Sequence, residues 1–286
     1  MLRQKIQFPI YLAIILGTVI WSLVDSPRTK FDSMFRPRYP DFARTASALM
    51  HTQANRQTGR PPVAALVGHH LLAADIFRDT LDQIPFSVHH VILISPNHFL
   101  VGHGRIQTMD KDFSTPYGRL KIDHQLVQAL HQSGGATLES STFVGEHGVA
   151  NLLPFIKKLL PAADVTPISG WPGNPQTTPH KIRTAIATNI QPDTLLLGSF
   201  DFSHYVPSAT AQLQDAITLK QLQQLQLDQL QQMAVDSPDG LWLFMAAAKD
   251  QAVQYFTPDR ATNSGILTHA PADTGVTSYI TGRFFR

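Results

Sequence analysis

The sequence predicts an α/β fold: a single sandwich domain with a central, mostly buried sheet flanked by helices, preceded by an N-terminal membrane helix. Two observations predict the domain. Short apolar runs rich in β-branched residues alternate with stretches whose apolar residues recur at helical spacing. The chain has 286 residues, 43% of them hydrophobic, which is enough to bury a full core. A third observation, an uncharged run near the N-terminus, predicts the membrane helix.

The membrane helix is expected within residues 1–25. Residues 8–24 contain no charged side chain, and this run lies at the short end of the roughly 17–25 residues that span a bilayer. A cleaved signal peptide is the alternative, but it needs small residues at a cleavage site, where this chain has Trp21 and Leu23. We therefore expect an uncleaved anchor with the globular domain outside the cytoplasm. Residues 26–60, rich in Pro, Arg and Thr, are expected to form a stalk before the domain at 61–286.

The elements of the domain follow in order from residue 61. Short apolar runs predict strands buried on both faces at 63–67, 88–95, 164–169 and 194–199, and a closing strand at 276–283. Helical spacing predicts helices at 71–81, 123–132, 149–160, 178–190, 208–233 and 238–248. Asp123 is expected to cap its helix. The Gln-rich helix at 208–233 is expected to pack one amphipathic face on the core.

The composition excludes several kinds of function. The chain has no cysteine, which rules out disulfides, thiolate zinc sites and a cysteine nucleophile. The formal net charge is +2, and the 23 Lys and Arg residues form no run, so we expect no nucleic-acid partner. The 13 histidines remain as the main source of metal ligands or general bases.

Histidines and an aspartate follow three of the predicted strands. His69 and His70 follow the first strand, His98 follows the second, and Asp201 with His204 follows the strand at 194–199. In open α/β sheets, sites form beyond the carboxyl ends of the strands. Imidazoles and a carboxylate that converge there are suited to a divalent metal or to general base catalysis. His147, which follows Glu146 at the start of a helix, is a further candidate, with helix capping by Glu146 as the structural alternative.

At these residues the chain resembles the Memo family, which is also called protein B of the AmmeMemoRadiSam system. Six motifs carry the resemblance, and they occur in the family's order. They are VGHHLLA at 67–73, ISPNH at 94–98, TPYG at 115–118 with Asp123, EH at 146–147 with LPF at 153–155, SFDFSHY at 199–205, and VTSY at 276–279. The similarity covers most of residues 61–286. It implies the fold of class III extradiol dioxygenases, the LigB-like fold.

The resemblance also implies a metal site. Carried over by motif, His69 and His98 are the ligand pair, Asp201 and His204 line the same pocket, and the family spacing favours His69 over His70. Asn263 occupies the position of the family's third ligand, a cysteine, and a neutral amide is a poor ligand for a soft or borderline metal. The expected cofactor is a divalent transition metal, namely Fe, Cu or Zn.

Two functions of different classes are consistent with these residues. The first is a non-haem, metal-dependent oxidoreductase in which His69, His98 and Asn263 hold the metal. In this oxidoreductase, His204 acts as the acid and base, and Asp201 orients it. His147 is a further catalytic candidate. The second is a non-catalytic module that binds a small molecule or a peptide in the same pocket.

Overall fold

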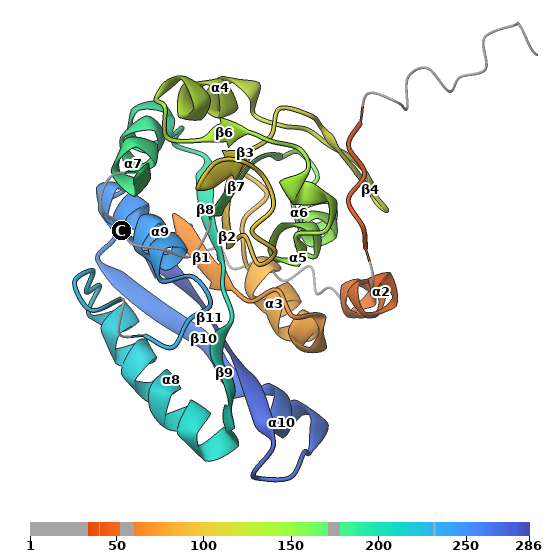
Figure 1. The fold of residues 1–286 in the computed structure, drawn as a ribbon, viewed down its shortest axis with the longest axis vertical. Coiled ribbons are helices and arrows are strands. Elements are labelled where there is room, and N and C mark those ends of the chain that lie inside the picture. Colours follow the sequence, from red (N-terminus) through yellow and green to blue (C-terminus); the bar gives the residue numbers. More distant parts are fainter. Residues whose placement is uncertain (1–33, 40, 52–59, 171–177, 231–232) are drawn as a thin grey trace, which may run out of the picture.

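The structure is a computed structural model that describes residues 34–39, 41–51, 60–170, 178–230 and 233–286 (Figure 1). The predicted membrane helix at 8–24 lies outside these residues, as do residues 26–33, 40 and 52–59 of the predicted stalk. Within the described part of the chain, no helix has the length and hydropathy needed to cross a bilayer. The anchor therefore stays a prediction of the sequence.

A mixed sheet forms the centre of the domain, and in the described residues it has nine strands. Along the sheet the order is β10 (Tyr255–Asn263), β11 (Gly275–Phe285), β1 (Ala64–Val67), β8 (Thr194–Ser199), β2 (His90–Pro96), β7 (Asp164–Gly170), β3 (Ile106–Thr108) and β6 (Thr137–Leu138), with β9 (Phe202–Pro207) also paired to β11. The strands β1, β8, β2 and β7 are parallel to one another, whereas β11 is antiparallel to β1, β9 and β10. A separate hairpin joins β4 (Phe113–Thr115) to β5 (Gly118–Leu120).

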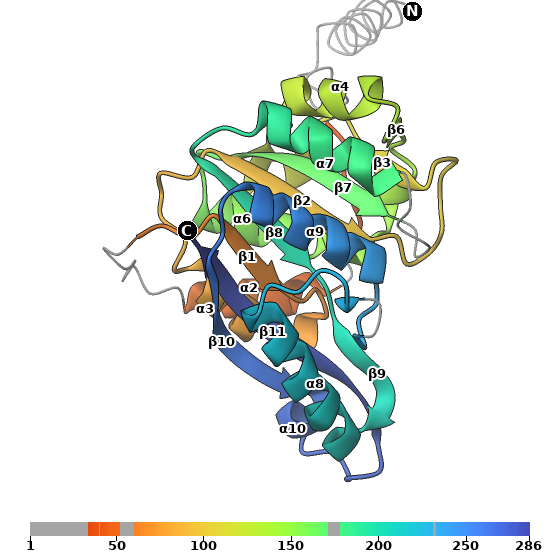
Figure 2. The same ribbon diagram turned by 90° about the vertical axis from the view of Figure 1, so that its left-hand side faces the viewer.

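Helices cover both faces of the parallel strands, which confirms the predicted α/β architecture (Figures 1 and 2). Figure 1 shows one group to the right of the sheet: α2 (Phe42–Met50), α3 (Ala74–Leu81), α5 (His147–Ala150) and α6 (Leu153–Leu159). The other face carries α4 (His124–Gln132), α7 (Thr178–Asn189) and α9 (Pro238–Asp250), and α8 (Ser208–Gln223) packs on β9, β10 and β11. Short helical turns lie at Leu71–Ala73, Thr142–Val144 and Ser264–Thr268, the last named α10.

The central strands are buried on both faces, as their continuous apolar sequences predict. Along β2, Val91 and Leu93 belong to the core under α3 and α6, and Ile92 and Ile94 belong to the core under α7 and α9. The side chain of Asp123 accepts a hydrogen bond from Leu126 N at 3.0 Å, which confirms its predicted cap.

Two predicted helices differ from the observed ones. The helix predicted at 149–160 is divided into α5 and α6, because Pro154 lies in the first turn of α6 and a proline there starts a helix but cannot continue one. The helix predicted at 208–233 ends at Gln223, and Leu225 beyond it has a φ of 52°.

Several elements give no clear signal in the sequence. β10 is polar, contains Pro258 and has an irregular register there, features typical of an edge strand. Within the predicted stalk, residues 42–50 form α2, whose Ala48 and Leu49 join the core beside α3 and α6. The chain therefore packs on the domain before residue 61.

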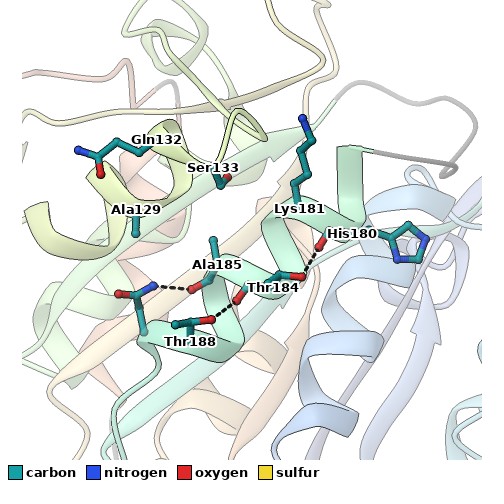
Figure 3. Close-up of a pocket in the computed structure, with 9 residues that line it drawn as sticks. Ala129, Gln132, Ser133, His180, Lys181, Thr184, Ala185 and Thr188 are labelled. Carbon is teal, nitrogen blue, oxygen red and sulfur yellow. Dashed lines mark hydrogen bonds between the residues drawn. The ribbon is translucent and has the colours of Figure 1, made fainter.

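Between α4 and α7, residues of the two helices line an open surface pocket (Figure 3). His180 and Lys181 of α7 lie on one side of it, and Ala129, Gln132 and Ser133 lie on the other. It contains no carboxylate and none of the residues that the sequence singles out, so it offers no support for either predicted function.

Candidate metal centre

The carboxyl ends of three parallel strands meet at one edge of the sheet. β8 lies between β1 and β2, with Val67 opposite Ser199 and Ile94 opposite Gly198. The residues that follow these strands therefore emerge side by side, and the structure brings His69, His98 and Asp201 together there.

His69 is buried, and one of its ring nitrogens is already used. Its Nδ1 lies 3.1 Å from Ser199 Oγ, and that hydroxyl donates its own hydrogen to Gly148 O at 2.6 Å. Ser199 Oγ must therefore accept from His69, which places the imidazole hydrogen on Nδ1 and leaves Nε2 as an acceptor. Burial lowers the pKa of His69 well below its ordinary value, and the neighbouring His98 and His147 lower it further.

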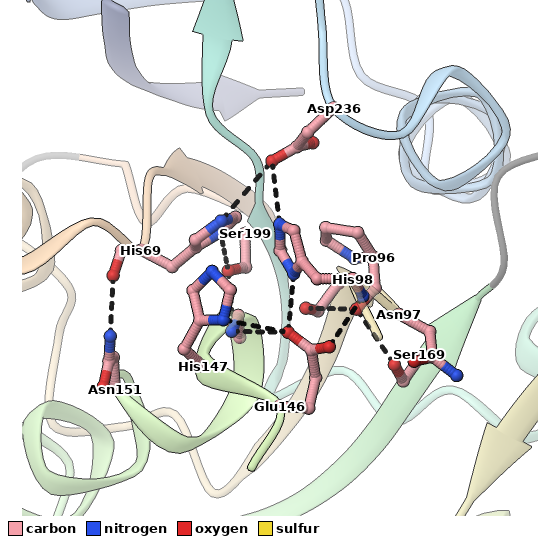
Figure 4. A network of polar contacts seen from close by, with 12 residues as sticks. His69, Pro96, Asn97, His98, Glu146, His147, Asn151, Ser169, Ser199 and Asp236 are labelled. Carbon is pink, nitrogen blue, oxygen red and sulfur yellow. Dashed lines mark hydrogen bonds and ion pairs between the residues drawn. The ribbon is translucent and has the colours of Figure 1, made fainter. Parts of the chain in front are cut away.

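His98 is held by a fully buried carboxylate (Figure 4). Glu146 Oε1 lies 2.7 Å from His98 Nδ1, and Glu146 Oε2 accepts the His98 backbone N–H at 2.8 Å. Glu146 also caps α5 by accepting from Gly148 N at 2.8 Å. Burial lowers the pKa of His98, but the carboxylates of Asp236 and Glu146 outweigh burial and raise this pKa to about 10.

His147 lies against both of these rings. Its imidazole stacks on that of His98 with centroids 4.1 Å apart and planes at 28°, and its centroid is 5.1 Å from that of His69. His69, His98 and His147 each offer one nitrogen, and these three atoms lie within 4.8 Å of one another. Burial, followed by the nearby His98, lowers the pKa of His147 to about 4, so its ring is neutral at pH 7.

Two carboxylates complete the cluster. Asp201 Oδ1 accepts the His69 backbone N–H at 3.1 Å, and Asp201 Oδ2 lies 3.4 Å from His69 Nε2. Asp236 Oδ2 lies 3.4 Å from His69 Nε2 and 3.8 Å from His98 Nε2. Burial raises the pKa of both carboxyl groups, and the charge of Asp236 raises that of Asp201 further.

The sequence reasoning missed Asp236. It precedes Ser237, the N-cap residue of α9, and no strand ends near it. The only local signal is an acidic residue beside a Ser-Pro helix start, and this is too common to indicate a site. Its position near the histidines depends on the packing of the segment before α9 over β8, which residue patterns do not encode.

His204 lies near the cluster, and within the described part of the chain no hydrogen bond or ion pair joins its side chain to the cluster. It is half-buried in β9, and burial lowers its pKa, while the charge of Asp236 acts in the opposite direction. The adjacent His70 does not enter the cluster, since its Nδ1 lies 2.5 Å from the hydroxyl of Tyr279.

Asn263 is the last residue of β10, and both of its amide atoms are occupied. Its Oδ1 accepts from Ile266 N at 3.0 Å as the N-cap of α10, and its Nδ2 donates to Ser208 Oγ at 3.0 Å. The amide therefore ties α10 to α8, and ligation of a metal by Asn263 stays a prediction.

A second group of His and Asp residues lies at the opposite edge of the sheet, where the parallel strands begin. His90 Nδ1 lies 2.9 Å from Asp164 Oδ1 and 3.8 Å from Asp123 Oδ2, and His89 Nδ1 lies 2.9 Å from Asp193 Oδ2. The strand register places His90 directly beside Asp164. All of these side chains are partly exposed, and their contacts join neighbouring strand starts.

Comparison with known proteins identifies the family. A family profile described as "Memo-like protein" matches residues 47–240. The chain belongs to this family. Among curated relatives, this Memo-like chain is 28% identical over 158 residues to a MEMO1 family protein of Methanothermobacter thermautotrophicus, covering 54% of this chain and 53% of that protein. It is 26% identical over 153 residues to one from Methanocaldococcus jannaschii, covering 51% of this chain and 53% of that protein.

The Memo-like chain spans about half the length of the curated relatives it matches. Among solved structures, an uncharacterized protein of Escherichia coli K12 aligns with a TM-score of 0.49 and 13% identity over 77% of this chain and 100% of that one. The sequence matches establish the family, and the chemistry of the site has to be argued from its own residues.

Proposed function

We propose that this Memo-like protein binds a divalent transition metal through His69 and His98 and uses it in oxidoreductase chemistry. One observation supports the metal. Hydrogen bonds occupy the Nδ1 atoms of both rings, so in the neutral rings both Nε2 atoms are acceptors, and they face the carboxylate oxygens of Asp201 and Asp236. The raised pKa of His98 indicates that the cluster favours a positive charge here, which a proton or a metal ion can supply. Acceptors that face acceptors in a buried site repel one another unless a cation or added protons lie between them.

The distances favour a metal over a hydrogen bond. Nitrogen–oxygen distances of 3.4 and 3.8 Å are longer than the usual 2.7–3.2 Å of a hydrogen bond. Two ligands that each lie about 2.1 Å from a tetrahedral metal are separated by roughly 3.4 Å. Imidazole and carboxylate together suit Fe(II) and Zn(II), and imidazole also suits Cu.

The surrounding residues would hold the two ligands in place. Glu146 orients His98, and Ser199 orients His69, which is the arrangement that fixes ring orientation and raises ligand basicity in metal sites. A bound redox metal supplies electron transfer or polarises an oxygen of a substrate. Asp201 bonds to the backbone of His69, so in this proposal it positions His69, and the neutral imidazole of His204 at the edge of the cluster accepts a proton from the substrate.

The test is the metal content of the full chain, purified without a histidine tag and analysed by elemental mass spectrometry. We expect about one equivalent of a transition metal per chain, and its loss in the double variant His69→Ala, His98→Ala. The matched control is His103→Ala, His124→Ala, which removes two exposed imidazoles and should leave the metal content unchanged.

A double variant that keeps the parental metal content would contradict the assignment. If the parent and both variants contain no metal, and added metal does not bind, the second reading gains support: a module that binds a small molecule or a peptide in the histidine cluster. Attachment to a membrane through residues 1–25 is a separate proposal, supported by the uncharged run at 8–24.

A further inference from the structure

We infer that Asp236 is the third protein ligand of this metal centre, in place of the side chain at position 263. The inference rests on the proposed function, because it assumes that His69 and His98 bind the metal. It goes further by naming a carboxylate that no motif indicates, and by assigning the centre the ligand set of two imidazoles and one carboxylate.

Position 263 is poorly suited to the role. The Asn263 amide is fully buried and bonds to Ile266 N and Ser208 Oγ, so turning it toward the imidazoles would uncap α10 and break its link to α8. A neutral amide is also a weak ligand for Fe, Cu or Zn.

Asp236 is placed where a third ligand has to lie. Its Oδ2 is the carboxylate oxygen that faces both imidazoles, at 3.4 Å from His69 Nε2 and 3.8 Å from His98 Nε2, as the dashed lines of Figure 4 show. Asp201 Oδ2, in contrast, lies 3.4 Å from His69 alone. Asp236 is therefore the carboxylate that lies between the two predicted ligands.

The second oxygen of Asp236 points to the same conclusion. Among the described residues, Asp236 Oδ1 is a buried side-chain atom with no hydrogen-bond partner. Buried polar atoms are nearly always paired, so an unpaired carboxylate oxygen at the cluster indicates that something outside the protein chain satisfies it. A cation held by the Asp236 carboxylate would do so.

The backbone holds Asp236 rigidly in this position. Its N–H donates to Asp201 O at 3.1 Å, and its Oδ2 accepts the Asp201 N–H at 2.9 Å. Ser237, the next residue, caps α9 through Gly240 N. The carboxylate is therefore fixed to the end of β8 on one side and to a helix on the other, as a preorganised ligand requires.

His147 is less suited to be the third ligand. Its ring stacks on that of His98 at 28°, and lone pairs lie in the ring plane, so the lone pairs of two stacked rings run side by side rather than converge. We assign His147 the role of holding the ring of His98 against Glu146. The resulting set, two imidazoles and one carboxylate, leaves coordination positions open and favours Fe(II) or Zn(II) over Cu(I), which prefers sulfur ligands.

The test is titration of the full chain, freed of metal, with Zn²⁺ by calorimetry and with Co²⁺ by visible absorption. Asp236→Asn keeps the size of the side chain and can still accept the Asp201 N–H. We expect it to weaken Zn²⁺ binding by at least about 100-fold and to change the Co²⁺ spectrum. The matched control, Asn263→Ser, preserves a helix cap, and its affinity should stay within about threefold of the parent.

The outcomes separate this inference from the proposed function. If the parent binds neither ion, the metal centre itself is wrong and the inference falls with it. If the parent binds and His69→Ala does not, but Asp236→Asn keeps the parental affinity and spectrum, only the inference is wrong. If Asn263→Ser loses as much metal affinity as His69→Ala does, the third ligand would be at position 263 and the inference would be overturned. Asp236→Glu keeps the charge and should bind Co²⁺ with an altered absorption spectrum. If its Co²⁺ spectrum matches that of the parent, this result would also count against the inference.

Discussion

At the scale of residues, single hydrogen bonds determine which atoms of the centre face one another. Ser199 has one hydrogen and gives it to Gly148 O, so the ring of His69 has to donate from Nδ1. Glu146 has the same effect on His98. Because each ring has one remaining nitrogen, these two buried partners direct the Nε2 atoms of both rings toward Asp236.

A buried carboxylate away from the centre has a consequence for the pH dependence of stability. Asp215 of α8 is 5% exposed and accepts hydrogen bonds from Ser278 Oγ at 2.6 Å and Ser203 Oγ at 3.2 Å. Burial raises its pKa, and the two serine hydroxyls offset only part of that effect. The folded protein therefore favours the protonated carboxyl group.

We expect Asp215→Asn to flatten the pH dependence of unfolding above pH 4. The unfolded chain releases this proton near pH 3.9, whereas the folded chain releases it only at a higher pH. The stability due to Asp215 is thus present below about pH 4 and is lost as the pH rises through the folded pKa. Urea denaturation from pH 4 to 7 should show the stability of the variant rising relative to that of the parent as the pH increases. A difference in unfolding free energy between variant and parent that stays constant from pH 4 to 7 would refute this prediction.

At the scale of elements, the four-residue helix α5 positions several groups of the cluster. α5 has four residues, yet Glu146 caps it, His147 begins it, and Gly148 approaches β2 closely. A Cβ at Gly148 would collide with the buried Ser95 Oγ and would lie 3.1 Å from Glu146 Oε1 and 3.5 Å from His69 Nδ1. Only a glycine allows α5 to pack this near the strand ends.

Gly148→Ala should therefore disturb both the fold and the centre. Overpacking of this kind typically costs about 1–3 kcal/mol, and we expect a similar loss of unfolding free energy together with weaker Zn²⁺ binding. The matched control is Gly145→Ala in the same loop, where an added Cβ meets nothing within 4 Å and φ is −130°. Its stability should remain within about 0.5 kcal/mol of the parent. Equal effects of the two changes, measured by denaturation and calorimetry, would show that the contact with Ser95 does not matter.

At the scale of the whole molecule, the centre joins parts of the fold that are far apart in the sequence. His69 follows β1, His98 follows β2, Glu146 caps α5, Asp201 follows β8, and Asp236 precedes α9. In the unfolded chain these groups are separated, so a metal held by His69, His98 and Asp236 would bind the folded state far better than the unfolded one.

Bound metal should accordingly stabilise the whole domain against unfolding. At a free Zn²⁺ concentration of 100 times the dissociation constant, linkage gives about 2.7 kcal/mol. For a domain of this size, this corresponds to a rise in Tm of roughly 5–10 °C. The variant His69→Ala, His98→Ala should show no such rise when both are followed by differential scanning calorimetry. A similar rise in the variant would place the stabilising site elsewhere, for example at His90, Asp123 and Asp164.

The sequence by itself determined the family, the strands β1, β2, β7, β8 and β11, and the positions of His69, His98, His147 and Asp201. These follow from local patterns, because a strand buried on both faces is continuously apolar and sites form where such strands end. Edge strands such as β9 and β10 carry no such pattern, since water covers part of their surface.

The tertiary structure alone decided which other groups lie near the histidines of the cluster. It placed Asp236 against two imidazoles and turned the amide of Asn263 toward α10 and Ser208. Both outcomes depend on how distant segments pack over the strand ends, and a residue's own neighbours in the sequence do not specify such contacts. Residue type and spacing therefore predicted which strand ends bring histidines together, and long-range packing selected the atoms that face one another there.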